Sequence, residues 1–372
     1  MSTRATLFHD WLAQVGALLP EVRVTRSRTL ARLVFGMIRS GSVTLLKIAA
    51  ATPACVNQAS TEHQFRRWLA NAEVKVTDLW RALLPSLVVS QSGRDLKLVL
   101  DPTPQNATAS IVMIGLICRR RTLPLAWRVM PGTEAWPQSL VEVVRELVAE
   151  IVPAIPEGCQ VTLIGDRGLT SAELIDVCRE VGWSALFRLS ANAHQGCTVR
   201  LADGRKSPVW DLVTKPGQRW SGTVDLCKGA GWRTVELTIR WDVARAEPWI
   251  LLSDRPAGAA RVREYRQRTS VEATYADCKR RGWDIEASKV TTLERLDRLL
   301  LGLHLAYWWS TQLGLRAIRR GERARYDRKD RRDLSVVRIG RAWLEARLDE
   351  PKRRPPLPFR ATATGFAFTW LA

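Results

Sequence analysis

Four residues with types and spacings suited to holding a phosphate group lie in the segment REYRQRTSVEATYADCKRRGW. They are Tyr265, Arg268, Glu272 and Lys279, separated by two, three and six residues. In a helix that turns by about 100° per residue, these positions fall on one face. A carboxylate there can bind a metal ion, while a guanidinium, an ammonium and a phenol hold phosphate oxygens. An ordinary charged surface helix has the same pattern, so both interpretations stay open at this point.

Two upstream aspartates supply the second half of this chemistry. Asp101 follows the apolar run KLVL and Asp166 follows VTLIG, so each is expected at the C-terminal end of a buried strand. A carboxylate in that position must reach a rim, a partner or a cation. A turn before Pro102 and a cap before Gly168 are the alternatives. With Glu272, the two aspartates would form a cluster of hard oxygen ligands, which Mg²⁺ and Mn²⁺ prefer.

A cluster of carboxylates in a basic protein suits DNA chemistry when metal ions neutralise it. Three carboxylates alone would repel a phosphodiester. Two divalent ions about 4 Å apart activate an attacking water or 3′-hydroxyl and stabilise the leaving oxygen. DNA hydrolysis and strand transfer are both in-line phosphoryl transfers, so one site serves both without a covalent enzyme nucleophile. None of the cysteines or histidines has to take part.

The charge of the chain indicates a polyanionic partner. Its 372 residues include 57 Lys and Arg against 37 Asp and Glu, a formal charge of +20 with a pI near 10.5. The longest apolar runs, 111–118 and 299–303, are far shorter than the ~20 residues that a bilayer requires. The N-terminus lacks the pattern of a signal peptide. We therefore expect a cytoplasmic protein without a membrane partner.

The seven cysteines form an odd set without a CxxC pair, so free thiols are expected rather than a disulfide framework or a zinc finger. His194 and Cys197 have a loosely ligand-like spacing. No second pair lies nearby, so the sequence does not favour a metal site there, and it assigns these two residues no other role.

Residues 1–90 are expected to form a helical N-terminal DNA-binding domain. Apolar residues recur at three- and four-residue steps in 7–19, 27–48 and 63–88, and prolines punctuate these stretches. Residues 60–62 offer capping side chains before the third helix. Basic residues on these helices can contact DNA, although a surface helix often carries as many.

Residues 91–190 are expected to form the first part of an α/β core, a mixed sheet flanked by helices. The second and third strands form a hairpin around Arg119, Arg120 and Arg121. The predicted strands are 96–100, 109–119, 122–130, 161–165 and 185–190, and the predicted helices are 136–152 and 171–181.

Residues 191–260 are expected to be a β-rich antiparallel insertion, because polar and apolar residues alternate between glycine-containing turns. Its strands are predicted at 197–201, 220–226, 234–243 and 249–253. A helix from about 260 to 281 then carries the opening motif, and residues 261–292 complete the core.

Residues 293–372 are expected to form a basic helical C-terminal region, a possible dimerisation surface. Tyr307, Trp308 and Trp309 lie in an apolar helix predicted at 293–313 and are interpreted as core. Residues 316–332 hold nine Lys or Arg against three acids, nine minus three giving +6, so this run is predicted to be loosely ordered or to bind phosphate. A helix at 336–348 and an extended tail at 351–358 are predicted to follow.

These motifs resemble those of the DDE transposases of bacterial insertion sequences, specifically the insertion-sequence-four-like group. The signature of that group, Y-x2-R-x3-E-x6-K, is matched without a gap by the four residues named first. The resemblance also covers LDPT at Asp101 and GDRG at Asp166, in the expected order. It spans roughly residues 60–315, including STEHQFRRWL at 60–69, which is similar to the N-terminal DNA-binding region of the family.

The resemblance implies an RNase H-like catalytic core interrupted by an antiparallel β insertion. It implies Asp101, Asp166 and Glu272 as catalytic ligands of two Mg²⁺ ions, for which Mn²⁺ can substitute. The other three residues of the signature would contact phosphates of the transposon end. The implied enzyme acts as a homodimer on double-stranded DNA, pairing the terminal inverted repeats in a synaptic complex before joining them to target DNA.

Some members of that family cut DNA through a hairpin and stack a tryptophan of the insertion on a flipped base. Trp249, sixteen residues before Tyr265, resembles that residue. An aromatic face stabilises an unstacked base by ~1–3 kcal/mol. A tryptophan at the start of a strand is otherwise often part of the core, so both roles remain open for Trp249.

Two rival functions are alternatives to a metal-dependent transposase. A transposase-derived DNA-binding protein without catalysis predicts the loss of at least one carboxylate, and all three are present. A simple RNase H-like nuclease does not explain the helical N-terminal module or the long insertion. The sequence therefore favours an enzyme that cleaves DNA at transposon ends and transfers the strand into target DNA.

Overall fold

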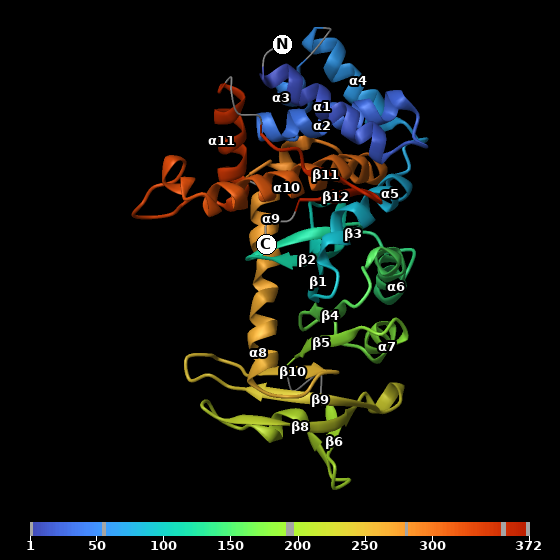
Figure 1. Cartoon of the computed structure of the whole chain (residues 1–372). Helices are drawn as coiled ribbons and strands as arrows, with labels where there is room; N and C mark the ends of the chain where they lie inside the picture. The colour runs from blue at the N-terminus through green and yellow to red at the C-terminus, as the bar shows by residue number, and fades with distance from the viewer. Residues whose placement is uncertain (1–2, 54–56, 191–196, 280–281, 351–354, 370–372) are drawn as a thin grey trace.

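A ten-stranded sheet runs through the length of the molecule, between a group of helices at one end and its last strands at the other (Figure 1). The computed structural model describes residues 3–53, 57–190, 197–279, 282–350 and 355–369. The strand order is β3-β2-β1-β4-β5-β10-β9-β8-β6-β7. The strands are β1 (Asp95–Pro104), β2 (Ala109–Cys118), β3 (Arg121–Pro131), β4 (Gln160–Gly165), β5 (Ser184–Leu189), β6 (Thr198–Arg200), β7 (Lys206–Pro208), β8 (Arg219–Leu226), β9 (Arg233–Arg240) and β10 (Trp249–Ser253).

The first five strands have the RNase H-like arrangement that was predicted. β1, β2 and β3 form an antiparallel meander, while β4 and β5 run parallel to β1. Helices α6 (Leu140–Ile151) and α7 (Ala172–Glu180) make the connections to the parallel strands. Helix α6 begins later than predicted because Ser139 and Glu142 cap it reciprocally. The order of strands and helices confirms the predicted α/β class.

The antiparallel strands that follow β5 extend the core sheet. β10 pairs with β5 through Ile250 and Leu189 on one side and with β9 on the other, and β8, β6 and β7 continue outward. The chain therefore leaves the core after β5 and returns through β10, at the strand next to its point of departure. This return delivers the following helix to the sheet.

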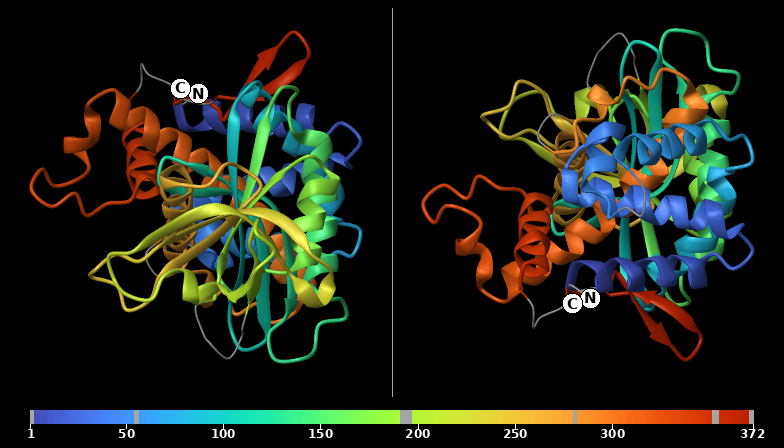
Figure 2. Two further views of the ribbon diagram at one scale, coloured as in Figure 1. Left: turned by 90° about the horizontal axis from the view of Figure 1, so that it is seen from below. Right: turned by 90° about the horizontal axis from the view of Figure 1, so that it is seen from above.

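The helix predicted at about 260–281 is divided into α8 (Ala259–Arg266), a 3₁₀ turn η6 (Gln267–Thr269) and α9 (Ser270–Cys278). In Figure 1 the three form one rod, and Figure 2 shows this rod and the pair α6 and α7 on opposite sides of the sheet. Lys279 ends α9 with an extended backbone (φ −85°, ψ −150°), so the predicted helix was too long at this end.

Close packing of the backbone explains why α9 ends where it does. Gly282 donates a backbone hydrogen bond to Lys279, and Trp283 donates one to Asp277. A Cβ atom at Gly282 would lie 1.7 Å from the carbonyl oxygen of Asp277. Only glycine permits this turn, which sends Trp283 into the core, where its indole N–H donates to the carbonyl of Met37.

Helices cover the end of the sheet formed by β3, β2 and β1 (Figure 1). The helix predicted at 27–48 is two helices in the structure, and so is the helix predicted at 63–88. The first of these breaks lies at Gly41, whose left-handed conformation ends α2. Asn57 caps α4 by accepting from the amide of Ser60, so the capping prediction for residues 60–62 was wrong. The helices are α1 (Thr3–Leu18), α2 (Val24–Ser40), α3 (Leu45–Ala51), α4 (Gln58–Ala70) and α5 (Val76–Val88).

The C-terminal region consists of two helices and a small hairpin. Helix α11 (Val336–Leu348) matches its prediction, and α10 (Leu293–Arg319) extends six residues beyond the predicted end. The hairpin of β11 (Phe359–Thr362) and β12 (Gly365–Phe368) was not predicted. Gln312 of α10 holds it by donating to the carbonyls flanking the hairpin. Of the predicted tail, residues 351–354 lie outside the described part of the chain.

Further 3₁₀ turns connect these elements: η1 (Val89–Gln91), η2 (Val152–Ala154), η4 (Val209–Leu212), η5 (Lys228–Ala230), η7 (Ile285–Ser288) and η8 (Glu322–Arg325). No single helix in the described ranges has the length and apolarity to cross a bilayer, while α2 and α3 together, bent by 92°, satisfy those criteria by length and composition.

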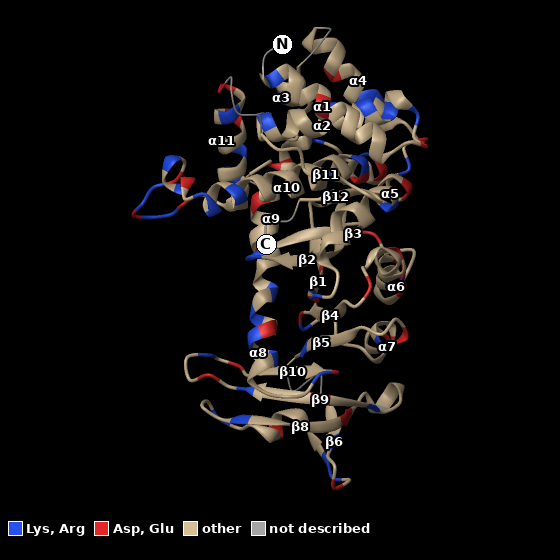
Figure 3. Cartoon of the chain, viewed as in Figure 1, with Lys and Arg blue, Asp and Glu red and all other residues tan. Residues whose placement is uncertain are grey.

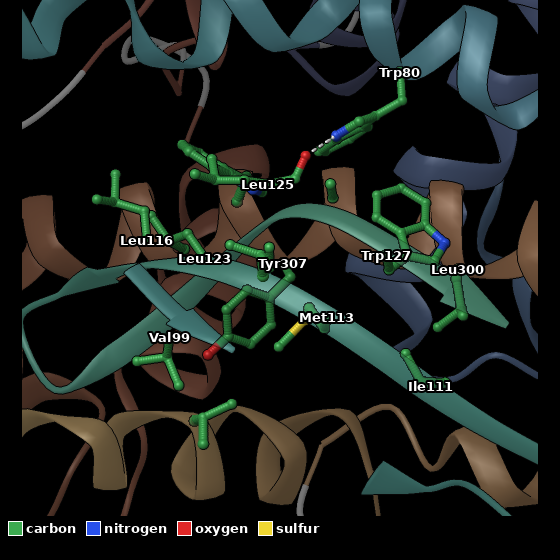
Figure 4. Close-up of a cluster of buried hydrophobic side chains, with 14 of the residues drawn as sticks. Trp80, Val99, Ile111, Met113, Leu116, Leu123, Leu125, Trp127, Leu300 and Tyr307 are labelled. Atoms are coloured by element: carbon green, nitrogen blue, oxygen red, sulfur yellow. Dashed lines mark hydrogen bonds between the residues drawn. The ribbon is translucent and has the colours of Figure 1, made fainter. Parts of the chain in front are cut away.

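Helix α10 packs against the sheet through aromatic residues. Figure 4 shows this cluster, in which Tyr307 of α10, Trp80 of α5 and Trp127 of β3 gather against the strands. Tyr307, Trp308 and Trp309 are buried, which confirms their assignment to the core. The indole N–H groups of Trp80 and Trp308 donate to the carbonyls of β3. Buried indoles thus retain hydrogen-bond partners.

His304 makes the stability of this core depend on pH. The centroid of its ring lies 4.2 Å from the centroid of the Trp127 ring, in an edge-to-face arrangement. Its Nδ1 has no hydrogen-bond partner in the described part of the chain. Burial lowers the pKa of His304 to about 3. Because the unfolded chain takes up a proton near pH 6.5 and the folded chain does not, stability is lost as pH falls below about 6.5.

We expect the variant His304→Phe to remove this pH dependence while keeping the edge-to-face contact. Between pH 7.5 and 5.5, the free energy of unfolding of the original protein should fall by about 1.4 kcal/mol more than that of the variant. Urea titrations followed by tryptophan fluorescence at both pH values measure this difference. Equal falls in the two proteins would show that His304 is protonated in the folded state.

Candidate active site

Asp101 and Asp166 lie side by side because of the register between two parallel strands. The last paired residues of β1 and β4 are Leu100 and Gly165, and each aspartate comes directly after them. Asp101 does not end its strand, contrary to the prediction, because β1 continues against β2 to Pro104. β1 has no partner on the β4 side beyond Leu100, so it is an edge strand from Asp101 to Pro104. An edge strand tolerates proline, here Pro102 and Pro104.

The guanidinium of Arg268 contacts all three predicted acidic residues. Its Nη1 lies 3.4 Å from Asp101, and its Nη2 lies 3.3 Å from Asp166 and 3.1 Å from Glu272. The side chain of Arg268 is only 13% exposed, whereas Glu272 is 63% exposed. Three carboxylates from β1, the end of β4 and α9 therefore face one cation, with Glu272 on the solvent side.

Helix α9 is fixed to the sheet by hydrogen bonds that the sequence did not indicate. Thr122 of β3 accepts from and donates to Thr274, and its hydroxyl lies 2.7 Å from that of Ser270. Arg121 donates to Asp277 at 2.7 Å in a largely buried ion pair. These contacts hold α9 against β3, which sets the position of Glu272 over the strand ends.

Tyr265 orients Asp166. Its hydroxyl donates to Oδ1 of Asp166 at 2.7 Å, and the amide of Arg167 donates to the same oxygen. Tyr265 is buried, and the centroid of its ring lies 5.1 Å from the centroid of the Trp249 ring. The residue that the sequence assigned to a phosphate contact thus holds a carboxylate in this structure, and the assignment to phosphate stays a prediction.

The two aspartates differ in acidity because their surroundings differ. Burial raises the pKa of Asp101 to about 6, opposed by Arg268 and reinforced by Asp166 and Glu272. Burial also acts to raise the pKa of Asp166, but hydrogen bonds from Tyr265 and Arg167, with the charge of Arg268, bring it below its usual value. Two adjacent carboxyl groups with separated pKa values are typical of functional sites.

Lys279 and Trp249 lie beside the carboxylates rather than among them. Lys279 donates to the carbonyl of Pro104, at the end of the strand that carries Asp101, and lies 3.8 Å from Glu286. Trp249 is half-buried, with the guanidinium of Arg245 at 4.6 Å over its ring. Their roles in DNA contact remain predictions.

Tyr275 is a site residue that the sequence analysis missed. Its hydroxyl donates to the backbone carbonyl of Asp101 at 3.2 Å. Its spacing of three from Glu272 and seven from Arg268 places it on the same helical face and would have identified it. His194 lies outside the described residues, and Cys197 is a free thiol whose pKa burial raises to about 11.

The donor set fits divalent cations, although the carboxylates now face a guanidinium. Within the described ranges, no three His, Cys, Asp or Glu side chains are placed to hold a metal ion. Three ionised carboxylates surround the single positive charge of Arg268, which leaves a net charge of two negative units at this position. Hard oxygen donors and this excess suit Mg²⁺ or Mn²⁺, with Arg268 standing in for part of the missing positive charge.

The sheet order and the acidic residues near its strand ends form an arrangement that is suited to metal-dependent phosphoryl transfer. Residues 138–309 match the family described as "Transposase DDE domain". This range includes Asp166 and Glu272 and begins after Asp101. This part of the chain is therefore similar to the DDE domain of transposases.

A chain from a cryo-EM structure of a piggyBac transposase synaptic complex with hairpin DNA is similar, with 12% sequence identity and a TM-score of 0.44 over 95% of this chain and 83% of that chain. No curated protein matched the sequence.

We expect Arg268→Leu to destabilise the fold by about 1–3 kcal/mol at pH 8, because three carboxylates lose their shared partner. The pKa of Asp101 is higher in the folded chain than in the unfolded chain, so the free energy of unfolding falls as pH rises from about 4 to 6. Without Arg268 the folded pKa of Asp101 rises further. The loss of stability of the variant relative to the original protein should therefore be large at pH 8 and small at pH 5. Arg263→Leu, on the exposed surface of α8, is the control.

Thermal and urea unfolding at the two pH values measure the Arg268→Leu effect. Millimolar Mg²⁺ or Mn²⁺ should recover part of the lost stability, because a cation that binds only the folded state stabilises it. A deficit that is independent of both pH and divalent ions would contradict the shared role of Arg268.

Proposed function

We propose that the protein is a transposase that cleaves DNA at the ends of a mobile element and joins the freed 3′ ends to target DNA. The observation that carries the proposal is the convergence of Asp101, Asp166 and Glu272 on one guanidinium, at the strand ends of an RNase H-like sheet. The match of residues 138–309 to a transposase DDE domain supports it. The signature at Tyr265 to Lys279 is consistent with an insertion-sequence-four-like element.

The three carboxylates are proposed to hold divalent cations, Mg²⁺ or Mn²⁺. Such ions, when bound, polarise a phosphodiester and lower the pKa of the attacking water or hydroxyl. Asp166 is prepared for this role because Tyr265 and Arg167 fix its orientation and keep it ionised. Asp101, with a pKa of about 6, is mostly ionised above pH 7.

Arg268 has two roles in the proposal. Without DNA it offsets the repulsion among the carboxylates, which it contacts at 3.1–3.4 Å. Once cations replace it there, its guanidinium is free to bind a phosphate oxygen of the transposon end, where its planar fork matches the phosphate. Lys279, whose ammonium contacts the carbonyl of Pro104 and lies 3.8 Å from Glu286 among the described residues, supplies a second phosphate contact.

The remaining assignments follow from the same proposal. The N-terminal helices bind the terminal inverted repeats, and two copies of the chain pair the two ends as a homodimer. The protein acts in the bacterial cytoplasm, on the nucleoid. Exposed arginines on α4, at positions 66 and 67, support the DNA contact of the N-terminal region.

Asp101→Asn and Glu272→Gln should each lower DNA nicking and strand transfer on the order of 10³-fold. Each variant removes a cation ligand that supports several kcal/mol of transition-state stabilisation. The substrate is a labelled duplex bearing the inverted repeat that flanks the gene. Asp211→Asn, an exposed aspartate of the same size, is the control.

Cation binding gives a second readout for these variants that does not depend on activity. Calorimetric titration with Mn²⁺ should show weaker binding for Asp101→Asn and Glu272→Gln than for Asp211→Asn. Unchanged cleavage with unchanged Mn²⁺ affinity would remove the catalytic assignment. Cleavage without any strand transfer by the original protein would favour a simple nuclease.

A hairpin intermediate is proposed for cleavage, with Trp249 stacking on a flipped base. Trp249 opens β10 and is half-buried at the edge of the site, where its ring contacts Tyr265, the partner of Asp166. The guanidinium of Arg245 now lies over the ring at 4.6 Å. A planar cation in this position is a plausible stand-in for a base, because both stack on an aromatic face.

Trp249→Ala should slow hairpin formation roughly tenfold or more while DNA affinity changes less, since one base–aromatic stack contributes ~1–3 kcal/mol. Trp232→Ala is a matched control, because Arg200 lies over the ring of Trp232 in the same way, at 4.8 Å. Denaturing gels of end-labelled DNA resolve hairpin from nicked product. An equal loss of affinity and hairpin rate would contradict the stacking role.

A further inference from the structure

A cavity of about 860 Å³ lies along α8 and α9, away from the carboxylates. Its walls are the β2–β3 turn, the face of the rod around η6, the end of α10, and the segment from η8 to the start of α11. In Figure 3 the rod and this C-terminal segment lie on the same side of the molecule, and both carry Lys and Arg. We call this cavity the arginine groove. Its charged lining residues are Arg119, Arg120, Arg121, Arg266 and Arg323.

The arginine groove and the active site use different side chains of one rod. Arg266, Gln267, Thr269, Ser270 and Ala273 line the groove, whereas Asp101, Asp166, Arg268 and Glu272 are not among its lining residues. A ligand in the groove therefore contacts other side chains than a phosphate held at the carboxylates. The groove is a separate binding surface.

The lining of the arginine groove is suited to a sugar–phosphate backbone. No Asp or Glu is among its described lining residues, while apolar side chains such as Ile117, Leu315 and Ile318 form part of its wall. Arginines bind phosphate oxygens, and apolar surface accepts deoxyribose. A small inorganic anion would use only the first of these features.

Two of the five arginines have no ion-pair or hydrogen-bond partner for their side chains among the described residues. Arg121 and Arg323 form ion pairs with Asp277 and Asp327, and Arg266 lies 3.8 Å from Asp242. Arg119 and Arg120 are exposed, and neither side chain forms a hydrogen bond or an ion pair with any described residue. These two guanidinium groups are therefore available to a ligand.

The backbone at these two arginines is strained. Cys118 pairs with Arg121, so Arg119 and Arg120 form a two-residue hairpin loop, with φ of 43° and 69°. Such a loop favours Asn-Gly, and a left-handed conformation costs other residues roughly 1–2 kcal/mol. Two arginines are thus a poor choice for folding at this turn. A strained feature of this kind indicates a function for the side chains.

We propose that the arginine groove binds the sugar–phosphate backbone of a DNA segment distinct from the one being cleaved, without reading its sequence. The inference rests on the proposed function, which makes DNA the substrate. It places a second stretch of DNA along α8 and α9, between the β2–β3 turn and the C-terminal segment.

The double variant Arg119→Asn with Arg120→Gly tests the inference, because it removes both free charges and installs the sequence that the turn prefers. Its free energy of unfolding should equal or exceed that of the original protein. Its binding to a fluorescein-labelled 30-base-pair duplex of arbitrary sequence should weaken. The slope of log affinity against log salt concentration should become shallower by about 2, at ~0.9 per phosphate contact.

The matched control replaces two arginines at exposed positions of the β-rich part, Arg205→Asn with Arg219→Asn. It changes the net charge equally and should leave the salt slope nearly unchanged. A second variant, Gln267→Glu, introduces a carboxylate into the groove without changing side-chain size and should also weaken binding. An equal change of slope in the control, or none in the groove variants, would overturn the inference.

Two further comparisons separate this inference from the proposed function. Loss of affinity should be the same for the arbitrary duplex and for a duplex bearing the inverted repeat, and a loss confined to the repeat would contradict backbone binding. If the original protein cleaves the repeat and the groove variants bind as it does, only the groove assignment fails. If the original protein neither binds nor cleaves DNA, the proposed function fails with it.

Discussion

The contact of Arg268 with three carboxylates is the interaction on which the site depends. Asp101, Asp166 and Glu272 would repel one another at the strand ends, and a single guanidinium at 3.1–3.4 Å compensates part of that repulsion. The compensation is incomplete, which leaves a region of excess negative charge in a chain of net charge +20. An excess of negative charge of this kind is suited to divalent cations.

The rest of the fold brings these groups to one point. Parallel pairing of β1 with β4 sets Asp101 beside Asp166, because each follows the last pair of residues. The chain then passes through the antiparallel strands and returns by β10 next to β5, which directs α8 and α9 back along the sheet. Hydrogen bonds from Thr122 to α9 fix Glu272 over the strand ends. Distant segments of sequence therefore meet through backbone pairing.

The rod of α8 and α9 presents different chemistry on its two sides. Arg268 and Glu272 lie toward the acidic strand ends, and the residues around η6 line the arginine groove. Arg266 lines this groove and also lies 5.9 Å from the centroid of the Trp249 ring, so the groove reaches the edge of the site. One short element thus lies between the carboxylates and the arginine groove.

The sequence by itself determined the order of the core elements, the burial of the aromatic helix and the bounds of α11, and it singled out the three carboxylates that converge on Arg268. Each of these depends on local periodicity or on a carboxylate that follows an apolar run. Only the tertiary structure decided that α9 ends at Cys278, that Arg268 bridges all three acids, and that a C-terminal hairpin packs on Gln312. These features depend on contacts between distant segments, such as the approach of Gly282 to Asp277, which no local pattern encodes.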